Sequence, residues 1–125
     1  MNKTTSLALS KGMKTLGVKQ ESEKYWEKEV GNDFKWHLVT GNIDWEPSQM
    51  DNMNVFSAFD PSELGEMLPV GCITKKVVVY KNCKPTKKHA YQCWRGHNFT
   101  ESFEAETMAE AMGEMWCYLK ENKLI

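Results

Sequence analysis

The sequence lacks the long apolar runs that membrane helices require, because none of its runs approaches ~20 apolar residues. Residues 1–11 contain no apolar stretch long enough for a secretory signal peptide. No Walker loop, G-x-G-x-x-G, H-E-x-x-H, G-x-S-x-G or EF-hand sequence occurs. The net charge of -1 excludes a generally basic protein that coats nucleic acid. We therefore expect a cytoplasmic protein that is not an enzyme.

Paired cysteines are also missing, because none of the four cysteines forms a C-x-x-C motif. Without an export signal we expect reduced thiols, most of them acting as small apolar side chains. The set Cys83, His89, Cys93 and His97 has four side chains that can bind zinc. A hairpin would place Cys83 and His89 beside the turn and Cys93 further along a strand, which argues against a shared ion. We predict no metal, no cofactor and no catalytic residue.

The chain has 125 residues, of which 41% are hydrophobic and 26% charged, the balance of a single folded domain. No internal repeat, low-complexity segment or linker divides residues 1–125. A short helix is expected over 6–16, capped by Ser6 and ended by Gly17. Residues 18–29 fit a strand or a helix. The alternation over 34–39 predicts a strand, and the polar segment 41–54 predicts a loop or edge segment.

Residues 60–68 carry the clearest local helix signals. Asp60 is a suitable N-cap, Pro61 fits the first helical position, and Glu63 fits the third. Phe59 can pack against Leu64 across this helix start. Pro69 predicts the end of the helix.

The C-terminal half predicts a β-meander followed by a long helix. Strands are expected over 74–83, 89–95 and 99–103, with turn residues at 82–86 and 96–98. The helix over 107–121 begins at a Thr107–Glu110 capping box. Its apolar stripe consists of Met108, Met112, Met115 and Leu119, which favours core packing over a methionine-rich binding groove. The fold class is therefore α+β, a small antiparallel sheet packed by two or three helices.

Three sequence blocks resemble a family of small phage and prophage proteins. They are LGVKQES followed by YW in 16–26, SAF followed by ELGEMLP in 57–69, and the C-terminal LKENKLI in 119–125. The blocks occur in the family's order, whereas residues 71–100 match it poorly. The resemblance implies a phage or prophage accessory protein in a bacterial cytoplasm, and it implies no activity.

Charge is distributed unevenly along the chain. Between residues 36 and 74 there are acids but no Lys or Arg, and between 67 and 100 there are bases but no Asp or Glu. Basic residues interleaved with aromatic ones can hold phosphate and stack on bases, although lysines also protect exposed sheet edges. The candidate contacts for a ligand or partner are Lys75, Lys76, Lys81, Lys84, Lys87, Lys88, Tyr91, Trp94, Arg95 and His97.

Separate acidic and basic segments suit charge-steered association, so the leading hypothesis is binding to a host or phage protein, for example as an inhibitor of host defence. The alternative is nucleotide or nucleic-acid binding through the basic hairpin 75–97. A small enzyme with a Cys or His centre is a third alternative, which no motif supports. Pairing of acidic and basic surfaces between copies of the chain would give a homo-oligomer.

Overall fold

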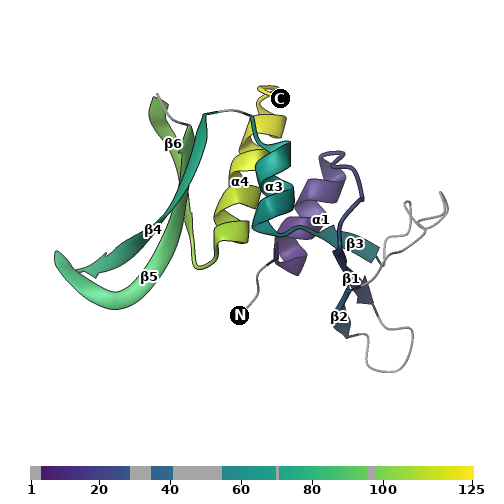
Figure 1. Cartoon of the computed structure of the whole chain (residues 1–125), viewed down its shortest axis with the longest axis horizontal. Helices are drawn as coiled ribbons and strands as arrows, with labels where there is room; N and C mark the ends of the chain where they lie inside the picture. Colours follow the sequence, from purple (N-terminus) through teal and green to yellow (C-terminus); the bar gives the residue numbers. More distant parts are fainter. Residues whose placement is uncertain (1–3, 29–34, 41–54, 70, 96–97) are drawn as a thin grey trace.

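The computed structural model describes residues 4–28, 35–40, 55–69, 71–95 and 98–125, with positions 88, 89, 95 and 98–101 described as backbone only. The expected loop at 41–54 and the candidate contact His97 lie outside the described residues. The α+β class is confirmed, because helices α1, α3 and α4 lie between two antiparallel sheets (Figure 1). The elements are α1 (Leu7–Thr15), β1 (Lys24–Lys28), β2 (Trp36–Thr40), β3 (Val55–Ala58), α3 (Pro61–Met67), β4 (Cys72–Lys81), β5 (Lys84–Arg95), β6 (Asn98–Ala105) and α4 (Met108–Glu121).

Helices α1 and α3 follow the local signals of the sequence. The Ser6 side chain caps α1 by accepting the Leu9 amide hydrogen, and Gly17 follows the helix with a φ of 90°. At α3, the Asp60 carboxylate accepts the Glu63 amide hydrogen while Glu63 accepts that of Asp60, which completes a capping box. Each cap satisfies amide groups that the first helical turn leaves without a partner.

The N-terminal sheet has the strand order β2-β1-β3 and is the main departure from the expected single sheet. Residues 24–28, which the sequence left open between helix and strand, form its central strand. Trp26 of β1 pairs with Leu38 of β2 and with Phe56 of β3. Helix α1 packs against β3, and the Lys14 ammonium lies 5.0 Å from the centre of the Phe56 ring.

The C-terminal sheet has the order β4-β5-β6, as the meander predicts. The turn between β4 and β5 is shorter than expected, because it holds only Asn82 and Cys83 and the following residues 84–86 already belong to β5. Helix α4 packs on one face of this sheet, where Cys93 and Phe103 form a cross-strand pair.

The apolar stripe of α4 belongs to the core, as its helical spacing indicates. Met115 and Leu119 are completely buried, and Met112 is 8% exposed. They share one apolar cluster with Met13 of α1 and Leu64 of α3. The methionine-rich face is therefore covered by the protein's own helices and sheet.

The start of α4 differs from the expected reciprocal capping box. The Thr107 hydroxyl does accept the Glu110 amide hydrogen, over 3.2 Å. The Glu110 carboxylate, however, accepts hydrogen bonds from the backbone amide and the hydroxyl of Ser6. Glu110 thus joins the first turns of α1 and α4, a contact between residues that are far apart in the sequence.

Thr5 is a completely buried connection between α1 and the N-terminal sheet. Its hydroxyl accepts the Phe59 amide hydrogen over 3.1 Å and lies 2.8 Å from the Ser10 hydroxyl. Its carbonyl oxygen accepts the hydrogen of Trp26 Nε1 over 3.0 Å. The hydroxyl and carbonyl groups of Thr5 therefore provide hydrogen-bond partners for Phe59, Ser10 and Trp26, which belong to three different segments.

We expect Thr5→Val to lower the free energy of unfolding by about 1–3 kcal/mol, because it keeps the shape but leaves the Phe59 amide buried without an acceptor. Urea denaturation followed by circular dichroism measures the change. The matched control is Thr15→Val in α1, where the same chemical change at an exposed position should cost less than about 0.5 kcal/mol. Equal effects of the two substitutions would contradict the role assigned to Thr5.

Candidate functional site

The basic segment forms a long hairpin of β4 and β5 that extends beyond α4 (Figure 1). Asn82 and Cys83 make its turn with φ values of 54° and 63°. Positive φ at both central residues is typical of a tight hairpin turn whose twist matches its strands. The pairing register shifts between Val78 and Tyr80, an irregularity of the kind that bends a strand.

The hairpin carries five lysines whose side chains are described, and all five are exposed to solvent. They are Lys75, Lys76, Lys81, Lys84 and Lys87. None of them forms an ion pair with a described carboxylate, whereas Lys19 and Glu21 pair elsewhere over 3.1 Å. Lys88 and Arg95 belong to β5, but their side chains are not described. The hairpin is therefore a projecting basic element.

The aromatic candidates are divided between the two faces of the sheet. Tyr91 lies on the face that α4 covers and packs against the core. Trp94 pairs with Ile73 of β4, and it follows the buried Cys93, so its side chain belongs to the opposite face. Tyr80, which the list of candidates omitted, is 68% exposed near the turn. Tyr80 and Trp94 therefore accompany the lysines outside the core, whereas Tyr91 lies on the face of the sheet that packs against α4.

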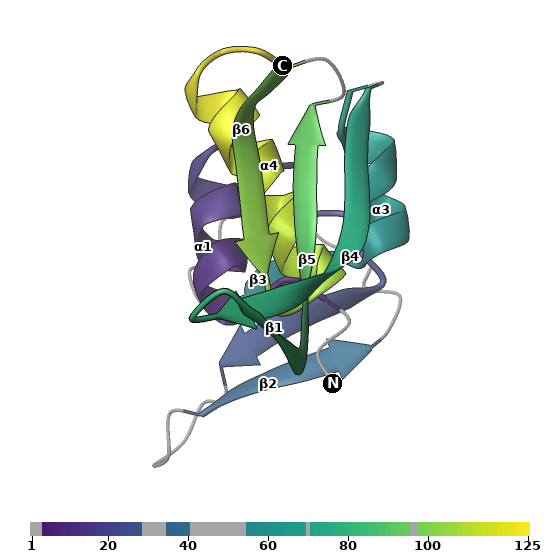
Figure 2. The same cartoon turned by 90° about the vertical axis from the view of Figure 1, so that its left-hand side faces the viewer.

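The second feature of this region is the face of the C-terminal sheet that carries Trp94, on the side opposite α4. Figure 2 shows the three strands in front of the helices, with no described helix over this side and only the curved distal part of the β4–β5 hairpin crossing in front of it. Ile73 is 44% exposed there, and Trp94 is half-buried. We call this surface the open face. Its residues, identified by their register and alternation, are Ile73, Lys75, Val77, Ala90, Gln92, Trp94, Ser102 and Glu104.

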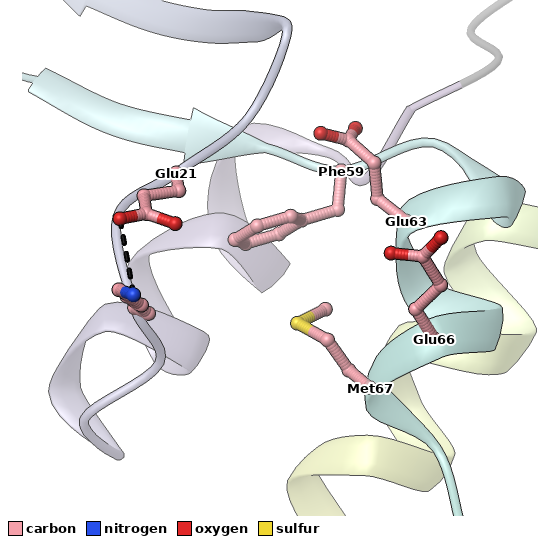
Figure 3. Close-up of a pocket in the computed structure, with 6 residues that line it drawn as sticks. Glu21, Phe59, Glu63, Glu66 and Met67 are labelled. Carbon is pink, nitrogen blue, oxygen red and sulfur yellow. Dashed lines mark ion pairs between the residues drawn. The ribbon is translucent and has the colours of Figure 1, made fainter.

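A hollow of about 350 Å³ lies where the chain before β1 meets α3 (Figure 3). Phe59 and Met67 supply its apolar lining, Glu21, Glu63 and Glu66 supply carboxylates, and Lys19 supplies an ammonium group that pairs with Glu21 over 3.1 Å. Glu63 is already bound, because its carboxylate accepts the amide hydrogens of Asp60 and Glu23, each over 3.0 Å. Burial raises the pKa of Glu63, and these two hydrogen bonds oppose the shift. The Lys19 ammonium already neutralises Glu21, so the charges that line the hollow point to no particular ligand.

The cysteines are free and differ widely in environment. Cys83 is exposed at the hairpin turn, whereas Cys93 is completely buried against α4. Burial raises the pKa of the Cys117 thiol to about 11, with a further contribution from the nearby Glu121 and Glu114 carboxylates. Among the described residues, no three His, Cys, Asp or Glu side chains are grouped closely enough to hold a metal ion.

These environments predict the order in which the thiols react with iodoacetamide. At pH 8, a thiol with a pKa of about 11 is ionised in roughly one molecule per thousand, and the thiolate is the reactive form. We expect exposed Cys83 to be alkylated first and Cys93 and Cys117 to react much more slowly, as measured by peptide mass spectrometry. Labelling in urea is the control, because unfolding should remove the difference. Fast labelling of native Cys117 would contradict the assignment.

Among the helices of the part of the chain that the structure describes, none is long and apolar enough to cross a membrane. Comparison with known proteins found no matching family model, no similar curated protein and no similar solved structure. The features of the molecule that bear on function are therefore the hairpin, the open face and the hollow. Of these, the hairpin was predicted from strand and turn signals and singled out by its charge, while the other two depend on tertiary structure.

Proposed function

We propose that this chain is a non-enzymatic binding protein that engages an acidic surface of a partner protein through the β4–β5 hairpin. The observation that carries the proposal is the group of exposed lysines, which project on a segment without Asp or Glu. The resemblance to phage and prophage proteins favours a host or phage protein as the partner. With a host protein as the partner, the chain would act as an inhibitor of host defence by binding that protein directly.

The separation of charge supports binding by electrostatic steering. The five exposed lysines lie on one hairpin, while the described carboxylates of the hollow lie beside α3. Opposite potentials on two proteins speed their encounter and disfavour partners of the wrong charge. Lysines at the rim of an interface contribute mainly to the association rate, so binding should weaken as salt increases.

Nucleic-acid binding through the same hairpin is the second candidate. A two-stranded β-ribbon fits the major groove of DNA, and β4–β5 is a ribbon of this kind. The exposed ring of Tyr80 could stack on an unpaired base. Lysine binds phosphate as a point charge, whereas arginine can donate two parallel hydrogen bonds to one group. The described side chains of the hairpin therefore favour sequence-specific recognition of nucleic acid less than arginines would.

The test compares proteins captured from a bacterial lysate by the wild-type chain and by the triple variant Lys81→Ala/Lys84→Ala/Lys87→Ala. The matched control is Lys35→Ala/Lys120→Ala/Lys123→Ala, which removes the same charge from exposed positions outside the hairpin. Each single substitution should change stability by less than about 0.5 kcal/mol, so loss of capture reports a lost contact. We expect the hairpin variant to lose the partner and the control to retain it.

Two results would contradict the proposal. Equal capture by both triple variants would show that the hairpin is not the contact surface. Loss of all capture after nuclease treatment would favour the second candidate, and the affinity for a labelled DNA duplex should then fall linearly with salt on a logarithmic scale. Retention of the captured protein after nuclease treatment supports a protein partner.

A further inference from the structure

The open face carries apolar side chains where a solvated sheet face would normally be polar. Ile73 and Trp94 form one cross-strand pair, and Val77 and Ala90 form another two rows away on the same face. Between them lies a row of Lys75, Gln92 and Glu104, in which Gln92 Nε2 donates a hydrogen bond to Glu104 over 3.1 Å. Tryptophan is among the residues most enriched at the energetic centres of protein interfaces.

The open face is also concave. The hairpin curves away from the helices and toward the open side, as Figures 1 and 2 show from two directions. The register shift between Val78 and Tyr80 lies within this curved part. Ala90 is only 5% exposed although no described helix covers it, and Val77 is half-buried. The bend therefore shelters the apolar row nearest the turn.

We propose that the open face binds an amphipathic helix of the partner protein, one whose apolar stripe is flanked by acidic side chains. This inference rests on the proposed function, because it assumes that the hairpin lysines meet the partner's carboxylates. Lys75 lies on β4 between the two apolar rows, and Lys81, Lys84 and Lys87 lie at or near the turn that bounds one end. The acid on the opposite side is Glu104, which already accepts the hydrogen bond from Gln92.

The dimensions of the sheet fit a single helix. Neighbouring strands are about 4.8 Å apart, so three strands span about 10 Å, close to the diameter of one helix with its side chains. On the opposite face of the sheet, a single helix, α4, already packs in this way. It contacts the sheet through its methionine stripe and carries Glu110 and Glu114. A second copy of the sheet that pairs face to face about an axis along the strands is a poorer occupant, since this pairing would bring two basic turns together.

The test uses a synthetic peptide with the sequence of residues 107–122 and the change Cys117→Ser, an acidic amphipathic helix former. It is titrated into the full ¹⁵N-labelled chain and followed by NMR. We expect shifts of the backbone amides of residues 73, 75, 77, 92 and 94 and of the Trp94 indole. Two peptides serve as controls: one scrambles the apolar stripe, and the other carries Glu110→Lys and Glu114→Lys. Both should bind much more weakly.

A matched pair of protein variants separates the two faces of β4. Ile73 and Val78 are similarly exposed, at 44% and 38%, but alternate to opposite faces of the strand. Ile73→Ser should weaken peptide binding by about tenfold, the loss expected for two or so buried methylene groups, whereas Val78→Ser should leave it unchanged. Denaturant melts of both variants confirm that each is folded at the titration temperature.

The outcomes distinguish this inference from the proposed function. Absence of shifts on the open face, shifts at positions 91, 93 and 103 that indicate exchange with α4, or equal effects of the two serine variants would overturn the helix site. The hairpin lysines can then still bind the partner, as the capture experiment shows separately. Open-face binding that is unaffected by Lys81→Ala/Lys84→Ala/Lys87→Ala would support the helix site and contradict the electrostatic role of the hairpin.

Discussion

Met115→Ala should lower the free energy of unfolding by about 2–5 kcal/mol, the range found when large apolar side chains are truncated in protein cores. Met115 is completely buried in the cluster that joins α4 to α1 and α3. Its removal costs the transfer free energy of the lost atoms and leaves a cavity that the surrounding helices fill only in part. Urea denaturation at constant pH measures the change.

Lys87→Ala is the comparison for Met115→Ala, because Lys87 is exposed and should contribute less than about 0.5 kcal/mol. The two substitutions therefore separate the residues that hold the fold from those available for binding. If Met115→Ala unfolded like the wild-type chain, the methionine stripe would not be the core, and α4 would become the candidate partner surface. The slope of free energy against urea should stay constant, since both variants unfold from the same folded state.

Local signals predicted the helices well because capping is a short-range interaction. Ser6 and Asp60 each bond to an amide three residues later, so the necessary residues are adjacent in the sequence. The methionine stripe was equally clear, because its spacing reports which side of α4 is buried. The exception at Glu110 is instructive: its carboxylate bonds to Ser6, a partner that no local pattern reveals.

The alternation over 34–39 predicted strand β2, but the rest of the N-terminal sheet could not be predicted because its pairing is not local. The central strand β1 has many Glu and Lys residues around Tyr25 and Trp26, and its strand conformation is decided by the partners at 36–40 and 55–58. Strand β3 has only four residues, of which Phe56, Ser57 and Ala58 are all buried. Burial on both sides removes the alternation by which a strand is recognised.

The candidate surfaces show the same division between local and tertiary information. The distribution of charge along the sequence was enough to identify the basic segment that forms β4 and β5. It did not show that Tyr91 faces the core while Trp94 lies on the open face, because that difference depends on which side α4 covers. A shift of the strand by one residue would exchange these two roles. The hollow likewise requires the meeting of residues 19–21 with α3.

Phe59→Ala should lower the free energy of unfolding by about 3–5 kcal/mol, the usual cost of removing a buried phenylalanine ring. Phe59 is 1% exposed and follows β3 immediately before the cap of α3. Its backbone amide donates to the Thr5 hydroxyl, and its carbonyl oxygen accepts the Thr5 amide hydrogen over 2.9 Å. The ring therefore packs at the position where α1, β3 and α3 are joined.

Met67→Ala is the matched control, because Met67 lines the same hollow but is only partly buried and should cost less. Thermal or urea unfolding of the two variants measures the difference. A loss below about 1 kcal/mol for Phe59→Ala would show that the surrounding side chains collapse into the space of the ring. The hairpin lysines lie on the other side of α4 from this junction, so the folded fraction of Phe59→Ala should keep its hairpin-mediated binding. That combination, weakened folding with unchanged binding, would place stability and recognition on separate parts of the chain.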